Sequence, residues 1–247
     1  GMLAHVNYKF PFWVAGILGL ISTVVAWRFL PHDEDELFKS ETKNPENELL
    51  TGGWNQLKQI MTPILITLFG MIFVASFGLA GFESIYSLYV NEVHNFDLNA
   101  IALVLTLNGI ISLILQVFFF DRLVRWLGEV RLMRYSFFLS LVGTIMVIYD
   151  HNHWHIIIAT LFVFEAFDML RPTITTLLTK MSKTNQGLLN GVNMSLTSVG
   201  NVIGPLISGY LLDVNYQYPY WFVSIFLIIS WVITLVLGRE RKAAAND

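Results

Sequence analysis

Seven stretches of the chain are almost continuously apolar, and charged residues gather between them. Each stretch is close to the ~20 residues that an α-helix needs to cross a bilayer. The first stretch is too long for a signal peptide and is not followed by a small-residue cleavage site. The pattern therefore predicts an all-α, polytopic membrane protein. We predict seven transmembrane helices, at Pro11–Leu30, Pro63–Val90, Asn99–Phe120, Leu132–Tyr149, His155–Met181, Leu188–Leu212 and Pro219–Gly238.

Among the loops between these spans, lysine and arginine occur only in alternate ones. The loops at 91–98, 150–154 and 213–218 contain neither residue. The other loops and the span ends beside them contain Lys39, Lys43, Lys58, Arg122, Arg125, Arg131, Arg134, Lys180, Lys183, Arg239, Arg241 and Lys242. Because cytoplasmic loops are enriched in Lys and Arg, we predict a cytoplasmic C-terminus and an N-terminus outside. An outside N-terminus without a signal peptide leads us to expect a fragment of a longer protein.

Polar side chains recur at intervals of four residues on some predicted spans. The third span carries Asn108, Ser112 and Gln116, and residues four apart share one face of a helix. The sixth span carries Asn193, Thr197 and Asn201 at the same interval. Taken singly, such residues usually serve helix packing. Their occurrence on spans 2, 3, 5 and 6 favours a shared polar cavity, with spans 1, 4 and 7 peripheral, as in bundles of three-helix repeats.

Four ionisable residues lie well inside the spans: Glu83, Glu165, Asp168 and Arg171. Each such charge costs about 2.5–3.5 kcal/mol at the centre of a membrane helix. Asp168 and Arg171 are three residues apart and can pair, but one cation cannot neutralise three acids. We therefore expect a site that exchanges protons and cationic ligands, with a buried structural salt-bridge network as the alternative. Pro172 removes a helical hydrogen bond to the carbonyl of residue 168 and predicts a bend.

Composition narrows the function further. The 247 residues are 55% hydrophobic and 13% charged, far from the ~25% charge of soluble domains. The net charge of −3 argues against nucleic-acid binding, and the lack of cysteine excludes disulfides and thiolate metal sites. No phosphate-binding Gly-rich loop or nucleophile elbow occurs, so we expect neither ATP-driven work nor an enzyme. No cofactor or metal is expected, and a solvated loop is the favoured interpretation of His151, His153 and His155.

Several short strings in order resemble the C-terminal half of NorA-type multidrug efflux pumps. The strings are Gly81–Tyr89, Phe118–Arg122, Phe167–Pro172 and Gly200–Gly209. Those pumps are twelve-helix drug:proton antiporters of the major facilitator superfamily. The resemblance implies that the seven spans correspond to helices 6–12 of that fold. It also implies three parts: the last helix of the N-terminal bundle at 1–30, a cytoplasmic inter-bundle linker at 31–62 and the C-terminal six-helix bundle at 63–247.

The resemblance also implies roles for individual residues. The residues implied in proton coupling are Glu83, Asp168 and Arg171. The residues implied in substrate binding are Glu83, Tyr86, Phe164, Glu165, Asp168, Asn193, Thr197 and Asn201. Of these, Glu165 departs from the apolar residue that the family pattern expects. The residues implied in gating or structure are Asp121, Arg122, Pro172, Gly200, Gly204 and Pro205. Close helix packing is an equally good interpretation of the Gly204-Pro205 step.

The leading hypothesis is efflux of amphipathic, often cationic, drugs in exchange for protons across a bacterial plasma membrane, without a cofactor. The partners expected are the lipid bilayer, the drugs, protons and the missing N-terminal half. One alternative is a proton-coupled transporter of another small solute on the same fold. A seven-helix receptor is the other. The lack of a lysine in the last span and of any cysteine argues against it.

Overall fold

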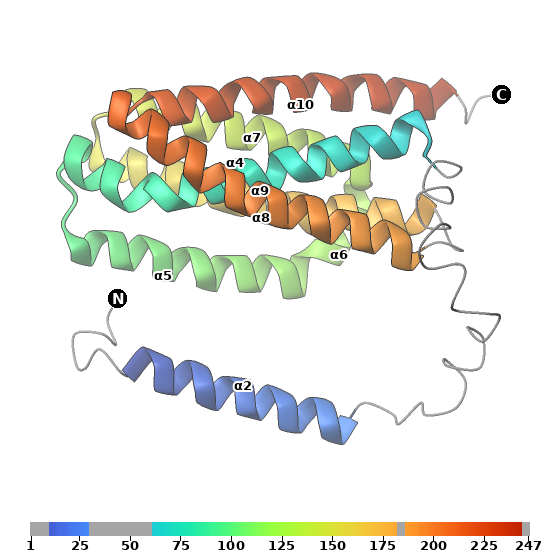
Figure 1. Cartoon of the computed structure of the whole chain (residues 1–247), viewed down its shortest axis with the longest axis horizontal. Coiled ribbons are helices and arrows are strands. Elements are labelled where there is room, and N and C mark those ends of the chain that lie inside the picture. The colour runs from blue at the N-terminus through green and yellow to red at the C-terminus, as the bar shows by residue number, and fades with distance from the viewer. Residues whose placement is uncertain (1–9, 30–60, 182–185, 244–247) are drawn as a thin grey trace. The chain divides into compact units, whose positions relative to one another are not determined.

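The computed structural model describes residues 10–29, 61–181 and 186–243, and every element in these ranges is a helix (Figure 1). The helices are α2 (Phe10–Phe29), α4 (Pro63–His94), α5 (Leu98–Ile114), α6 (Phe120–Leu127), α7 (Glu129–Tyr149), α8 (His153–Met181), α9 (Gln186–Val214) and α10 (Tyr218–Ala243), with a π-helical turn, η1 (Leu115–Phe119), between α5 and α6. The predicted all-α class is confirmed. Residues 31–60 of the predicted linker lie outside the described ranges.

The chain divides into two units, residues 1–61 and 62–247. In the first unit, α2 is an apolar helix of 20 residues that carries Arg28 in its last turn. The second unit contains α4 to α10. The assignment of the first unit to an N-terminal bundle and of the second to a six-helix bundle remains a prediction.

Five described helical runs are long and apolar enough to cross a membrane: Pro63–His94, Leu98–Leu127, Glu129–Tyr149, Gln186–Val214 and Tyr218–Leu237. A shorter apolar stretch covers Ala15–Arg28 of α2. The helix α8 is not among the five and carries Glu165, Asp168 and Arg171 in its middle. The run Leu98–Leu127 includes α5, η1 and α6, so the third predicted span contains a π turn that its sequence pattern did not indicate.

Local signals set the ends of several helices. Thr62 caps α4, because its Oγ1 accepts a hydrogen bond of 3.3 Å from the Leu65 N–H and Pro63 follows at the first helical position. Asp97 caps α5 in the same way, accepting from the Ala100 N–H at 2.9 Å. Gly128, at φ +76°, makes the sharp turn between α6 and α7, a conformation that suits glycine. These residues set where α4, α5 and α7 begin.

An exposed turn joins α7 to α8. The Asp150 carboxylate accepts from the Asn152 N–H and contacts the His155 ring, each at 2.9 Å, and these interactions hold the pKa of Asp150 below its usual value. At the opposite ends of the same two helices, Lys180 donates to Glu129. The pairing of α7 with α8 is thus fixed at both ends.

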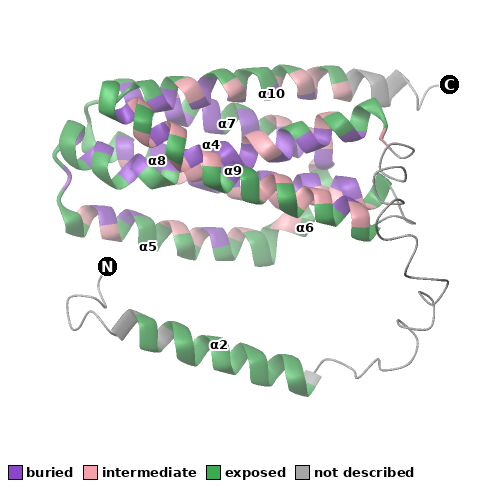
Figure 2. Ribbon diagram, in the orientation of Figure 1, coloured by how far each residue is buried: buried purple, intermediate pink, exposed green. Residues whose placement is uncertain are grey.

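Buried side chains gather on α4, α7 and α8, whereas α5 is mostly exposed (Figure 2). The helix α4 packs most extensively on α9, and α7 packs most extensively on α8. The expectation that the fourth span is peripheral to a cavity remains a prediction, although α7 is buried over as large a share of its span as α4. Its small residues explain this: Ser136, Ser140, Gly143 and Thr144 are buried and let α8 approach closely.

Candidate functional site

The register of α4 against α8 determines where Glu83 and Asp168 lie relative to each other. The Phe82 and Phe164 rings meet edge to face at 5.3 Å, and a Cβ on Gly78 would lie 2.9 Å from the Phe167 ring. These contacts show that α4 and α8 are antiparallel neighbours. Glu83 follows Phe82 and Asp168 follows Phe167 in the chain. Each acid thus lies one residue, or about 100° of rotation, beyond a side chain that faces the other helix. Because the two helices run in opposite directions, this rotation directs both carboxylates to the same side of the helix pair.

The two carboxylates lie at different depths on this side. In the same register, Glu83 is level with a point five residues before Asp168, a separation of about 8 Å along the helix axes. Glu83 is exposed on α4, and Asp168 is half-buried on α8. The register therefore predicts that the two acids lie on one face of the unit, at different depths.

A hydrogen-bonded chain links α5 to Asp168. The Ser112 hydroxyl donates to Asp168 Oδ2 at 2.7 Å, and Gln116 Nε2 donates to Ser112 Oγ at 2.9 Å. The first of these bonds stabilises the charged carboxylate, since hydrogen bonds to ionised groups are the stronger ones. The four-residue spacing of Ser112 on α5 and Gln116 in η1 thus aligns both side chains in one chain of hydrogen bonds to the acid of the neighbouring helix. Asn108, one turn earlier, has a buried Oδ1 without a hydrogen-bond partner in the described ranges.

Arg171 does not neutralise Asp168 by direct contact. Across the part of the chain that the structure describes, the ion pairs are Asp150–His155 and Glu129–Lys180. The intrahelical pair between Asp168 and Arg171 that the three-residue spacing allows is therefore not formed. The Asp168 carboxylate instead accepts a hydrogen bond from the Ser112 hydroxyl.

Polar residues of α9 bridge to its neighbours. Asn193 Nδ2 donates to Thr175 Oγ1 of α8 at 3.0 Å, and the Ser76 hydroxyl of α4 donates to Thr197 Oγ1 at 3.4 Å. Asn201, one turn beyond Thr197, is exposed. The structure thus places Asn193 and Thr197 at contacts between helices, and Asn201 at a free surface of α9.

Tyr86 and Phe164 lie inside a closed aromatic cluster, away from any described pocket. Tyr86 is 0% exposed and Phe164 is 2% exposed. Their rings lie 5.5 Å apart, and Phe82 joins this pair to Tyr220 of α10 at 5.2 Å. This cluster ties α4, α8 and α10 together. Substrate contact by Tyr86 and Phe164 remains a prediction, and in the described conformation both residues pack the core.

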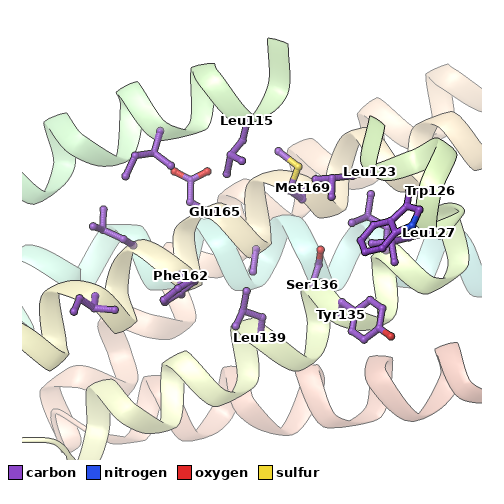
Figure 3. Close-up of a pocket in the computed structure, with 15 residues that line it drawn as sticks. Leu115, Leu123, Trp126, Leu127, Tyr135, Ser136, Leu139, Phe162, Glu165 and Met169 are labelled. Atoms are coloured by element: carbon purple, nitrogen blue, oxygen red, sulfur yellow. The ribbon is translucent and has the colours of Figure 1, made fainter. Parts of the chain in front are cut away.

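Glu165 points to a different place from Asp168. Only 8% of the residue is exposed, and both carboxyl oxygens are buried without a hydrogen-bond partner among the described residues. Glu165 lines a pocket of about 700 Å³ between α5, η1, α6, α7 and α8, and Asp168 is not part of its lining (Figure 3). The resemblance implies one substrate site for Glu165 and Asp168, whereas of these two residues only Glu165 lines this pocket. No pattern in the sequence predicts the pocket, although position 165 departs from the apolar residue that the family pattern expects.

The residues with predicted gating roles fall into two groups. Asp121 and Arg122 are exposed in the first turn of α6, directly after the π turn. Pro172 and Pro205 lie inside α8 and α9, which continue as helices past them. Gly200 and Gly204 are buried against α4, where an added Cβ would come within 2.9 Å of Phe77 N and 2.6 Å of Phe77 O respectively. Close packing explains both glycines, and gating by any of these residues remains a prediction.

The described residues contain no group of three or more His, Asp or Glu side chains that could hold a metal ion. The chemistry of the site is therefore that of carboxylates, hydroxyls and amides on the faces of α4, α5, α8 and α9. Such groups can bind protons and cations and can hydrogen-bond a ligand.

The sequence matches known proteins along its whole length. The profile of the Major Facilitator Superfamily matches residues 1–149 and 68–247. Multidrug resistance protein 1 of Bacillus subtilis (strain 168) is 36% identical over 246 residues, which cover 100% of this chain and 61% of that protein. Quinolone resistance protein NorA of Staphylococcus aureus (strain COL) is 33% identical over 248 residues, with the same coverage. The chain thus spans about three-fifths of the length of these curated relatives.

Proposed function

The chain belongs to the Major Facilitator Superfamily, and we propose that it exports amphipathic cationic drugs in exchange for protons as the C-terminal part of a twelve-helix transporter. Members of this family are multi-pass membrane transporters. The names of two relatives, a multidrug resistance protein and a quinolone resistance protein, support drugs as the substrate class. The match with this family also leaves the seven-helix receptor without support.

The observation that carries the proposal is the packing of α4 against α8, whose register predicts a common side for Glu83 and Asp168. Two acids on one face of α4 and α8, with the second held by Ser112, form a site that can bind a proton or an organic cation. A carboxylate inside a membrane protein is costly unless it faces water or binds a cation or a proton. Competition between the two ligands for the same oxygens couples their movements.

The proposed cycle follows from that competition. With the site open to the outside, protons bind Glu83 and Asp168 and release the drug. The unit then rocks against the N-terminal half, and the protons leave to the cytoplasm. The free carboxylates attract the next drug cation, while exposed polar groups such as Asn201 line the path. The proton gradient supplies the energy, so the proposal requires no cofactor.

The location is part of the proposal. We place the protein in a bacterial plasma membrane with its C-terminus in the cytoplasm, because the basic loops fall on that side. The two relatives named above come from bacteria. The partners are the lipid bilayer, protons and an N-terminal half that would complete the cavity facing Glu83 and Asp168.

Transport by inside-out membrane vesicles of an expression host tests the proposal. The vesicles contain the complete gene product, and an imposed pH gradient should drive ethidium uptake. Asp168→Asn should abolish this uptake, because the amide cannot exchange a proton, while the protein level in the membrane stays unchanged. Asp213→Asn, which changes an exposed acid near the end of α9, is the matched control and should transport normally.

Wild-type rates in Asp168→Asn would overturn proton coupling by this residue. Ethidium uptake that persists without a pH gradient would overturn antiport.

A further inference from the structure

We infer that the pocket around Glu165 is a second binding site, distinct from the Glu83 and Asp168 face, and that it takes an amphiphilic ammonium ion from the bilayer. The pocket lies entirely within the second unit, between α5, η1, α6, α7 and α8 (Figure 3). Its volume of about 700 Å³ falls within the ~300–1,000 Å³ range of small-molecule sites. The inference does not depend on the proposed antiport cycle.

Charge complementarity identifies the class of ligand. Of the fifteen residues that line the pocket, Glu165 is the only one with a carboxyl group, and none is Lys, Arg or His. Both Glu165 oxygens are buried and lack a partner in the described ranges, so they can accept hydrogen bonds from a ligand. A protonated amine supplies both the positive charge and the N–H donors that a buried carboxylate lacks.

The remaining walls fit an apolar body. Apart from Ser136, they are apolar and aromatic side chains from five helical segments, with Leu115, Trp126, Leu139, Phe162 and Met169 among them. In Figure 3 the Glu165 carboxyl lies at one end of the labelled group and Trp126 at the other. A ligand with its ammonium group at Glu165 would therefore extend its tail toward Trp126. Methionine and aromatic walls adapt to tails of different shape.

The rim of the pocket indicates entry from the lipid. Trp126 is 81% exposed and Phe162 is 51% exposed, and Tyr135 and Ile158 beside them are also exposed. Large apolar side chains on the surface of a membrane helix bundle face acyl chains. An amphiphile already dissolved in the bilayer can thus reach Glu165 without crossing water. This distinguishes the pocket from the polar face that contains Asp168 and Asn201.

Quenching of tryptophan fluorescence tests the inference. The full chain in phosphatidylcholine nanodiscs is titrated with 12-bromododecylammonium, whose tail bromine quenches an indole that it contacts. Saturable quenching is expected, and Trp126→Phe should lose most of its amplitude. The neutral probe 12-bromododecanol has the same tail without the charge, and it should bind the wild type at least about tenfold more weakly.

Two charge-neutralising variants complete the test. Glu165→Gln should weaken 12-bromododecylammonium at least about tenfold and leave 12-bromododecanol unchanged. Asp213→Asn removes an exposed carboxylate of α9 that does not line the pocket, and it should retain the affinity of the ammonium probe within about twofold. Equal affinity of the two probes, or no effect of Glu165→Gln, would mean that the pocket holds only acyl tails and would overturn the inference. A loss in Asp213→Asn as large as in Glu165→Gln would overturn the assignment to Glu165. None of these outcomes bears on whether Asp168 couples proton movement to ethidium transport, so the two proposals fail separately.

Discussion

Two acids three residues apart on α8 have very different surroundings. The Asp168 carboxylate is half-buried and receives the Ser112 hydroxyl, whereas the Glu165 carboxylate is buried among apolar side chains without a partner in the described ranges. A spacing of three residues separates two side chains by about 60° around a helix. That angle is enough to direct one acid to the polar face and the other into the pocket against α7.

The hydroxyl of Ser112 should be needed for export through its contact with Asp168. Ser112→Ala removes the donor and leaves the carboxylate with one hydrogen bond fewer, a loss of about 1.5–3 kcal/mol for a charged acceptor. We expect pH-driven ethidium uptake to fall about tenfold in vesicles. Ser112→Thr keeps the hydroxyl and should restore most of the rate, which a packing role alone would not explain. Uptake at the wild-type rate by Ser112→Ala would show that this bond has no role in transport.

The sequence was sufficient to single out Glu83 and Asp168 but not to place Glu165. The cost of a charge in a membrane helix follows from residue type and position alone, so all three acids could be recognised as functional candidates. Whether two of them share a cavity depends on which neighbours fill the adjacent grooves. For Glu165 those neighbours are Leu115 in the π turn and Leu139 on α7, and no pattern along the chain predicted their approach.

Among the helices of the second unit, the most extensive contact is the crossing of α4 and α9. Gly81, Gly200 and Gly204 lie at this crossing, where backbone atoms of one helix meet those of the other. Small residues four apart on α9 indicated such an approach, and the structure confirms the packing interpretation for Gly200 and Gly204. The partner helix could not be read from α9 alone, because the same small-residue pattern suits any neighbour.

A methyl group at the crossing should separate α4 from α9. Gly204→Ala would place a Cβ 2.6 Å from Phe77 O, a backbone atom that cannot move aside without shifting the helix. Overpacking of this kind costs about 1–3 kcal/mol, so the midpoint of thermal unfolding in detergent should fall by several degrees. Gly209→Ala lies on the same helix, has nothing within 4 Å, and is the matched control. Differential scanning fluorimetry of both variants measures the effect. A shift as large in Gly209→Ala would point to helix propensity or lipid contact in place of the crossing.

The π turn is a feature of the third span that its pattern of apolar residues does not predict. The sequence from Asn99 to Phe120 is apolar throughout and fits a regular helix. In the structure, η1 interrupts the run at Leu115–Phe119 and changes the rotation of α6 relative to α5. Turns of this kind often occur at functional sites. Here it contributes Leu115 to the pocket and Gln116 to the chain of hydrogen bonds that ends at Asp168.

In the second unit, α9 buries a small share of its span although it carries a polar stripe whose last member, Asn201, is exposed. The stripe of α5 differs, because its buried Ser112 donates to Asp168 of α8. Soluble proteins would place an exposed stripe against water, but a membrane unit is mostly surrounded by acyl chains. The exposed part of the α9 stripe therefore implies a second protein surface or a water-filled space opposite it. The sequence pattern predicts the helices and their polar faces, but their degree of burial depends on the neighbours that each helix receives.

The chain offers a direct test of which exposed surface faces water, because it contains no cysteine. Single cysteines can be introduced at Asn201 on α9 and at Val236 on α10, both of which are exposed in the described unit. A methanethiosulfonate reagent with a fixed positive charge reacts with the thiolate, and a thiolate forms readily only where water is present. In native membranes, Asn201→Cys should react at least about tenfold faster than Val236→Cys, because we place Asn201 on a water-filled cavity and Val236 against lipid.

An excess of ethidium should slow the labelling of Asn201→Cys if drug and reagent compete for the same space. Equal rates at the two positions would mean that the polar face of α9 is not hydrated, and the exchange of protons for drugs on that face would lose its physical basis.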